Sequence, residues 1–225
     1  MRQNHIQKPK VRPKPRYGPS IGSGMEASVK PLLDNPRRVH KVFSLDWISK
    51  NYSMGGHLRW ISREAFSITD VPIKDVQPRR RARRGIHTIP ASQWERLTFL
   101  LATHSKNVIS AAKKLKIPVP EVFKPVAVEG KSGHFWVIEQ TNLEKEGAVV
   151  IPASNVDNFP FDSGAIKNEI ITQLWKDKRK LEQAGYFEDP RHRQFGGWML
   201  RIDKLGNKWE RFLVDGSNFK FVPKE

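Results

Sequence analysis

Residues 134–152 read HFWVIEQTNLEKEGAVVIP. Two runs rich in β-branched and aromatic residues, 134–140 and 148–152, flank a polar loop at 141–147. This pattern predicts two neighbouring β-strands. Downstream, the runs 198–202 and 209–214 predict a hairpin, and a strand at 219–222 is expected to close the same sheet. The end of the chain therefore predicts an antiparallel sheet.

A long helix is predicted between these two pairs of strands. Apolar residues recur at helical spacing from Ile166 to Leu181, which predicts one buried stripe. Asp162 or Ser163 is the expected N-cap, and Gly185 is the expected stop. Residues 127–225 are therefore expected to form an α+β domain: an antiparallel sheet with one long helix.

Upstream, residues 91–126 predict short helices. Ser92 and Glu95 have the spacing of a capping box, so a first helix is expected to run to about residue 105. A second is expected at 107–116, where apolar residues again recur at helical spacing. Pro120 is placed to begin a third short helix at 118–124.

The run Asn107-Val108-Ile109-Ser110-Ala111-Ala112-Lys113-Lys114-Leu115-Lys116-Ile117 resembles the core of a Fis-type helix-turn-helix. The resemblance covers about residues 94–125, and it implies that 118–124 form a recognition helix that enters the DNA major groove. The chain departs from that pattern, because Pro118, Pro120 and the end at Lys124-Pro125 leave a helix of barely two turns. Glu121 would also face the DNA phosphates unfavourably. The alternative is a small helical packing module whose lysines are merely exposed.

The first 25 residues form a basic, proline-rich arm. No acidic residue precedes Glu26, and alternating prolines favour an extended conformation over a helix. A small mixed segment is expected at 36–76, followed by an arginine-rich linker at 77–90. Arginine pairs with phosphate in a forked geometry, so this linker favours phosphate contacts over a purely solvated connector.

The basic side chains of the arm, the linker and the predicted helices are the candidate nucleic-acid-binding residues. They are Lys8, Lys10, Arg12, Lys14, Arg16, Arg79, Arg80, Arg81, Arg83, Arg84, Lys106, Lys113, Lys114, Lys116 and Lys124.

The charge of the whole chain favours a polyanionic partner. Forty Lys and Arg stand against 23 Asp and Glu, for a formal net charge of +17. Nucleic acid, either DNA or structured RNA, is the expected partner, with other proteins of a larger assembly. No membrane association is expected. Without a secretory signal, the chain is expected in the cytoplasm, nucleoid or organelle matrix, or in a virion.

No catalytic or metal-binding pattern stands out. The chain has no cysteine, and its seven histidines do not show metal-site spacing. No Walker-type phosphate loop is present, and acidic residues near 129–146 give only the weak scatter of a nuclease. The sequence therefore predicts no enzyme, no cofactor and no metal.

The function expected from these observations is a non-catalytic nucleic-acid-binding protein. It would associate with DNA through the helix-turn-helix-like unit, while the arm and linker contact phosphates, as in proteins of phages or mobile elements. The alternative is a structural RNA-binding component of a ribosome or other large ribonucleoprotein.

Overall fold

The computed structural model describes residues 10–23, 27–43, 79–80, 87–88, 91–130, 133–161, 164–188 and 193–222. Most of the expected mixed segment at 36–76, together with Lys8, Arg81, Arg83 and Arg84, lies outside these ranges. No helix within them combines the length and apolar character needed to cross a membrane.

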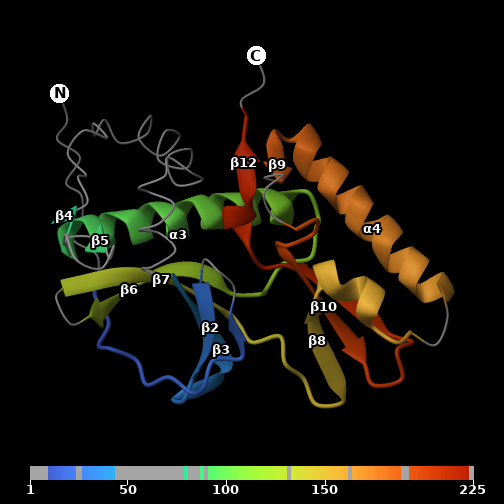
Figure 1. Ribbon diagram of the computed structural model, residues 1–225, viewed down its shortest axis with the longest axis horizontal. Coiled ribbons are helices and arrows are strands. Elements are labelled where there is room, and N and C mark those ends of the chain that lie inside the picture. The colour runs from blue at the N-terminus through green and yellow to red at the C-terminus, as the bar shows by residue number, and fades with distance from the viewer. Residues whose placement is uncertain are drawn as a thin grey trace.

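The first sheet has five antiparallel strands in the order β1-β2-β3-β7-β6 (Figure 1). Their bounds are β1 Gly22–Ser23, β2 Ala27–Leu32, β3 Asn35–Phe43, β6 Phe123–Gly130 and β7 Gly133–Thr141. Strand β7 is central to the pairing, because it joins β6 along its whole length and β3 from Arg38 to Lys41. The sheet therefore spans the expected boundaries near residues 36, 77 and 127.

Helix α3, Ala91–Lys114, lies along one face of this sheet (Figure 1). It is a single continuous helix, so the expected helix-turn-helix is wrong. Its buried stripe runs on without a break from Leu97 and Leu101 through Ser105 to Val108 and Ala112. Because the spacing stays helical throughout, nothing in the sequence ends the helix near residue 105.

The expected recognition helix at 118–124 is also absent. Lys116 ends the helical region in a left-handed conformation, with φ of 58°. Pro118 and Pro120 then disfavour a helix for the residues that precede them, and β6 begins at Phe123. The residues expected to read DNA bases are instead a connection and the start of a strand.

The second sheet has three antiparallel strands in the order β11-β10-β8. Their bounds are β8 Ala148–Pro152, β10 Trp198–Asp203 and β11 Trp209–Leu213. Helix α4, Gly164–Gln183, packs beside it through Ile170, Leu174 and Leu181, and the chain leaves α4 through Gly185, with φ of +88°. The α+β class and the long helix are therefore confirmed.

Short elements complete the fold. They are β4 Arg79–Arg80 paired with β5 His87–Thr88, β9 Tyr186–Glu188 paired with β12 Phe219–Phe221, and the 3-10 turns η2 Ala153–Asn158 and η3 Gly216–Asn218. The last strand therefore pairs with β9. The prediction that it would close the sheet of β10 and β11 was wrong.

The strands predicted at 134–140 and 148–152 form as β7 and β8, but they belong to different sheets. The polar residues between them connect the two sheets. Helix α3 also joins both halves, because Leu97 and Leu101 pack in the core of the first sheet while Val108 and Ala112 pack in the core that includes α4 and β10. The two sheets and α3 therefore surround a common junction.

Candidate functional site

A buried ion pair joins the two sheets at this junction. Lys41 lies on β3 and is 5% exposed. Its Nζ pairs with Oδ2 of Asp215, which follows β11. Lys41 Nζ also donates to Ser217 Oγ at 3.4 Å. The side chains of Lys41 and Asp215 are 7% and 19% exposed, so the pair is largely buried. Such a pair is costly to desolvate, so its retention here points to a role other than stability alone.

Asp215 is held in its charged form. Burial by itself would raise the pKa of Asp215, but the charge of Lys41 and hydrogen bonds from Lys41 and Ser217 outweigh it and lower that pKa. The backbone N–H of Ser217 donates to Asp215 Oδ1 at 2.9 Å. The carbonyl of Gly197 accepts from the backbone N–H groups of Val214 and Asp215, at 2.9 and 3.1 Å. These hydrogen bonds therefore hold the backbone of Asp215, and with it the carboxylate, in one position.

Gly216 fixes the same segment against helix α3. A Cβ atom at this position would lie 2.6 Å from the backbone oxygen of Ser105 and 2.9 Å from the Cβ of Val108. Only glycine allows the turn after Asp215 to approach the helix this closely. Helix α3 thereby sets the position of the carboxylate.

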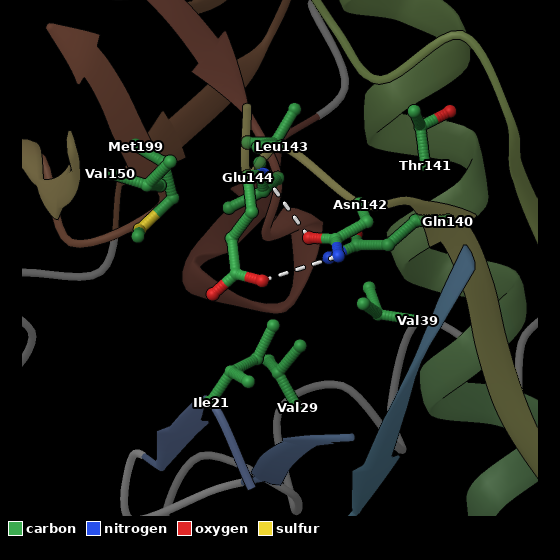
Figure 2. Close-up of a pocket in the computed structure, with 11 residues that line it drawn as sticks. Ile21, Val29, Val39, Gln140, Thr141, Asn142, Leu143, Glu144, Val150 and Met199 are labelled. Atoms are coloured by element: carbon green, nitrogen blue, oxygen red, sulfur yellow. Dashed lines mark hydrogen bonds between the residues drawn. The ribbon is translucent and has the colours of Figure 1, made fainter. Parts of the chain in front are cut away.

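A cavity of about 140 Å³ is lined by residues of both sheets and of the connection between them (Figure 2). Val39, two residues before Lys41 on β3, and Val214, directly before Asp215, are both part of its wall. The apolar lining comes from both sheets and from the segments next to them: Ile21, Val29, Val39, Val150, Met199 and Val214. Mostly apolar lining with a few polar groups is typical of small-molecule sites, and it would suit a ring such as a nucleotide base.

The polar edge of the cavity is the connection between the sheets, from Gln140 to Glu144. Thr141 Oγ1 accepts hydrogen bonds from Arg38 and from the backbone of Val122. Asn142 bonds the carbonyl of Pro36 and both the backbone and the carboxylate of Glu144 (Figure 2). Gln140 is different, because its Oε1 is buried and has no partner among the described residues.

The outer face of the first sheet carries a second charged cluster, around Glu139. Arg12 Nη1 lies 2.8 Å from Glu139 Oε2, Lys124 Nζ lies 3.0 Å from Oε1, and His40 is adjacent. Burial opposes charge on Glu139, but these cations outweigh it and lower its pKa. Burial also lowers the pKa of His40, although Glu139 opposes this. Burial raises the pKa of the neighbouring Tyr17 to about 12.

Through this cluster the basic arm is tied to the sheet. Arg12 N–H donates to the carbonyl of Ala127, and Glu129 N–H donates to the carbonyl of Arg12. The arm is extended, as predicted, but backbone hydrogen bonds dock it on the strands between residues 12 and 18. Arg12 therefore serves an intramolecular contact.

The other predicted nucleic-acid-binding residues are not gathered into one site. Lys124 joins Arg12 at Glu139, whereas Lys10, Lys14 and Arg16 are exposed on the arm. Four lysines are exposed on the second half of α3 and just beyond it: Lys106, Lys113, Lys114 and Lys116. Arg79 and Arg80 form β4, and the remaining arginines of the linker lie outside the described residues.

Sequence analysis missed the residues of the junction. Lys41 and Asp215 are far apart in the chain, and neither belongs to a recognised motif. One available pattern was overlooked: Gly22-Ser23-Gly24-Met25-Glu26-Ala27-Ser28-Val29 follows the kinase phosphate loop G-x-G-x-x-G-x-V, with Ala27 at the third glycine. These glycines lie at the end of the basic arm, and they do not have the spacing of a Walker-type phosphate loop. Across the described ranges, no group of three or more His, Cys, Asp or Glu is placed to hold a metal ion.

Comparisons with known proteins add little detail. No protein-family model matches the chain, and no curated protein matches it. Among solved structures, the chain is similar to the crystal structure of a Helicobacter pylori proinflammatory kinase, CtkA, with a TM-score of 0.38 and 10% identity. The similarity covers 91% of this chain, which spans 59% of that kinase.

Two expectations are corrected by this comparison. The chain was expected to be a non-catalytic nucleic-acid-binding protein and not an enzyme, whereas the structure it is similar to is that of a kinase. The expected association with DNA also loses its structural basis, because the helix-turn-helix on which it depended is one straight helix followed by a strand.

Proposed function

We propose that this chain is a phosphotransferase that binds a nucleoside triphosphate between its two sheets and transfers the γ-phosphoryl group. The observation that carries the proposal is the buried pair of Lys41 and Asp215 beside the cavity. Phosphoryl transfer needs little covalent chemistry from a protein, but it needs cations and a metal-binding carboxylate placed around the phosphates.

The positions of these two residues match their proposed roles. In protein kinases a lysine on the third strand of an antiparallel sheet binds the phosphates, and an aspartate followed closely by glycine binds Mg²⁺. Here Lys41 lies on β3 of the first sheet, and Asp215 precedes Gly216. In the nucleotide-free chain the two opposite charges neutralise each other; with nucleotide bound, Lys41 would pair with the phosphates.

The described residues fit a nucleotide-bound Mg²⁺. This ion usually takes one or two carboxylates from the protein and completes its shell with phosphate oxygens and water. Asp215 supplies one carboxylate that is held charged, so a cage of three acidic side chains is not required. The ion would neutralise charge on the phosphates.

The glycine pattern at residues 22–29 supports the same reading. Strands β1 and β2 are the antiparallel pair that flanks it, and the register places Gly22 opposite Val29. Ile21 and Val29 line the cavity. In the proposed complex, backbone N–H groups of the β1–β2 pair contact the phosphates.

One feature departs from the kinase pattern. In protein kinases the lysine pairs with a glutamate of the helix behind the sheet. Here Glu95 of α3 pairs with His134, at 2.6 Å, and Lys41 pairs with Asp215. In this chain α3 would therefore act through its contact with Gly216, which positions Asp215.

Transfer also requires an acceptor for the proton of the attacking hydroxyl. The kinase catalytic loop has an aspartate and, five positions later, an asparagine. Asp189 and Gln194 have that spacing, just before β10, with Gln194 at the asparagine position. Asp189 lies outside the described residues, so its assignment as the proton acceptor comes from this spacing.

The reaction proposed is an in-line displacement. An acceptor oxygen forms a bond to the γ-phosphorus while the bond from that phosphorus to the β–γ bridging oxygen breaks. The nucleoside diphosphate leaves with the electron pair, and the proton of the acceptor hydroxyl passes to the base. Lys41 stabilises the charge on the phosphate oxygens as the bond breaks.

The surface charge favours a polyanionic partner for this enzyme. The exposed lysines of α3 and the net charge of +17 would attract nucleic acid or a comparable polyanion. Nucleic acid therefore remains our proposal for a partner.

The test is calorimetric titration of the full chain with ATP and Mg²⁺. Wild type is expected to bind one equivalent, while Lys41→Met and Asp215→Asn bind at least about tenfold more weakly. Lys113→Met, which removes an exposed lysine, is the matched control and should bind as wild type does. If wild type binds neither ATP nor GTP, or if Lys41→Met binds ATP unchanged, the proposal is wrong.

A further inference from the structure

Gln140 is a buried polar residue in the wall of the cavity, and the ion pair does not explain it. It is the second-last residue of β7 and is 6% exposed. It stands opposite Val39 in the β3–β7 pairing and opposite Phe123 in the β6–β7 pairing. Ile138, two residues earlier on the same face, packs in the core with α3. On this face of the first sheet, Ile138 therefore packs in the core with α3, and Gln140 lines the cavity (Figure 2).

The side-chain oxygen of Gln140 lacks a hydrogen bond in the described structure. Leaving a buried acceptor unpaired lowers the stability of the folded chain. The neighbouring Thr141 and Asn142 are both satisfied by protein groups. Among the polar residues at this edge of the cavity, Gln140 is therefore a buried acceptor without a hydrogen bond, available to a donor from a ligand.

We infer that Gln140 reads the base of the nucleotide by accepting a hydrogen bond from an exocyclic amine, and that the site therefore selects adenine. This inference rests on the proposed function. Adenine presents an amine on its six-membered ring, whereas hypoxanthine and guanine present a carbonyl oxygen at that position. A carbonyl facing Gln140 Oε1 would bring two acceptors together and leave the buried oxygen unsatisfied.

The apolar walls explain why one side chain can decide the choice. Ile21, Val29, Met199 and Val214 all line the cavity, and such apolar side chains would contact any purine ring in the same way. Such walls provide affinity without discrimination between purines. Discrimination between purine bases therefore depends on the polar residues of the cavity, among which Gln140 has a buried acceptor without a hydrogen bond.

The experiment compares dissociation constants of ATP, ITP and GTP with Mg²⁺ for the full chain. ITP is the sharpest comparison with ATP, because its base, hypoxanthine, presents a carbonyl where adenine has the amine. Wild type is expected to bind ATP at least about tenfold more tightly than ITP. Gln140→Met conserves volume and should bring this ratio close to one. Met199→Leu, at an apolar wall position, should keep the wild-type ratio.

The outcomes separate this inference from the proposed function. Equal affinity of wild type for ATP and ITP would overturn the inference and leave nucleotide binding standing. Preference for GTP, or a ratio unchanged in Gln140→Met, would also overturn it. Failure of wild type to bind any of the three would overturn the proposed function and the inference together.

Discussion

Lys41 of β3 and Asp215 after β11 form a buried ion pair that joins the two sheets of this chain. The pair is supported from both sides. Ser217 bonds both partners, and Gly216 lies directly on the backbone of α3. A site built from distant parts of the chain is thereby held in one geometry, next to a cavity that both sheets line.

Breaking this pair should destabilise the fold. Lys41→Met leaves the Asp215 carboxylate buried without its cation, and we expect the free energy of unfolding to fall by about 3 kcal/mol. The double variant Lys41→Met/Asp215→Asn removes both charges and should recover part of that loss. Urea denaturation of the three proteins measures the coupling. Strictly additive losses in the double variant would show that the two side chains do not interact.

Gly216 should tolerate no side chain. Gly216→Ala places a methyl group 2.6 Å from the Ser105 oxygen, so the turn must move away from α3. We expect a loss of about 2 kcal/mol in unfolding free energy and weaker nucleotide binding, because Asp215 moves with the turn.

The matched control for that variant is Gly164→Ala. Gly164 lies in the first turn of α4, where an added Cβ meets no atom within 4 Å. This change should be neutral or stabilising by up to about 1 kcal/mol. If Gly216→Ala behaves like Gly164→Ala in thermal melts, the close approach to α3 does not position Asp215.

The basic arm should contribute to stability. Arg12→Ala removes the hydrogen bond and ion pair to Glu139, and we expect a loss of about 1 kcal/mol, because the Arg12 side chain is half-exposed. Arg16→Ala, on the same arm, removes an exposed side chain and should cost less than 0.5 kcal/mol or so. Equal melting temperatures for both variants would mean that Arg12 stabilises nothing.

Stability should fall on acidification in two steps. His40 has a lowered pKa in the folded chain, so the unfolded chain binds its proton first. The stabilisation is complete above about pH 6.5 and is lost as the pH falls through the lower folded-state pKa. Glu139 and Asp215, also lowered, give a second loss that begins below about pH 4.5.

The control for the first step is His40→Gln, measured by urea denaturation at several pH values. The groups that face His40 are Tyr17, Glu139, Arg12 and Lys124, and all remain in this variant. The loss that begins near pH 6.5 should disappear, while the loss at lower pH remains. A wild-type stability that is flat between pH 7 and pH 5 would contradict this assignment.

Much of the fold could be predicted from local patterns. The spacing of Ile170, Leu174 and Leu181 predicted helix α4, and short apolar runs rich in β-branched and aromatic residues predicted β7, β8, β10 and β11. Local patterns do not determine which strands pair. Strands β7 and β8 are neighbours in the sequence but belong to different sheets, because β7 pairs with β3 and β6. The helix-turn-helix was predicted because Ala111 and Ala112 fit that motif as well as they fit one long helix.

The candidate site was harder to predict for the same reason. Lys41 is one lysine among many, and its burial beside Asp215 depends on the pairing of both sheets with α3. The glycine pattern at residues 22–29 was the one local indication of phosphate binding. The positive charge of the chain favoured exposed lysines and arginines as binding residues, whereas the lysine proposed to bind phosphate, Lys41, is buried.

The most direct test of the account is transfer of the labelled γ-phosphoryl group of ATP, with Mg²⁺, to the chain itself, to added nucleic acid or protein, or to water. The account predicts a rate above that of a protein-free control, reduced at least about 10²-fold in Asp215→Asn and unaffected in Gly164→Ala. Label transfer that is equal in wild type and Asp215→Asn, or absent from wild type with bound ATP, would contradict it.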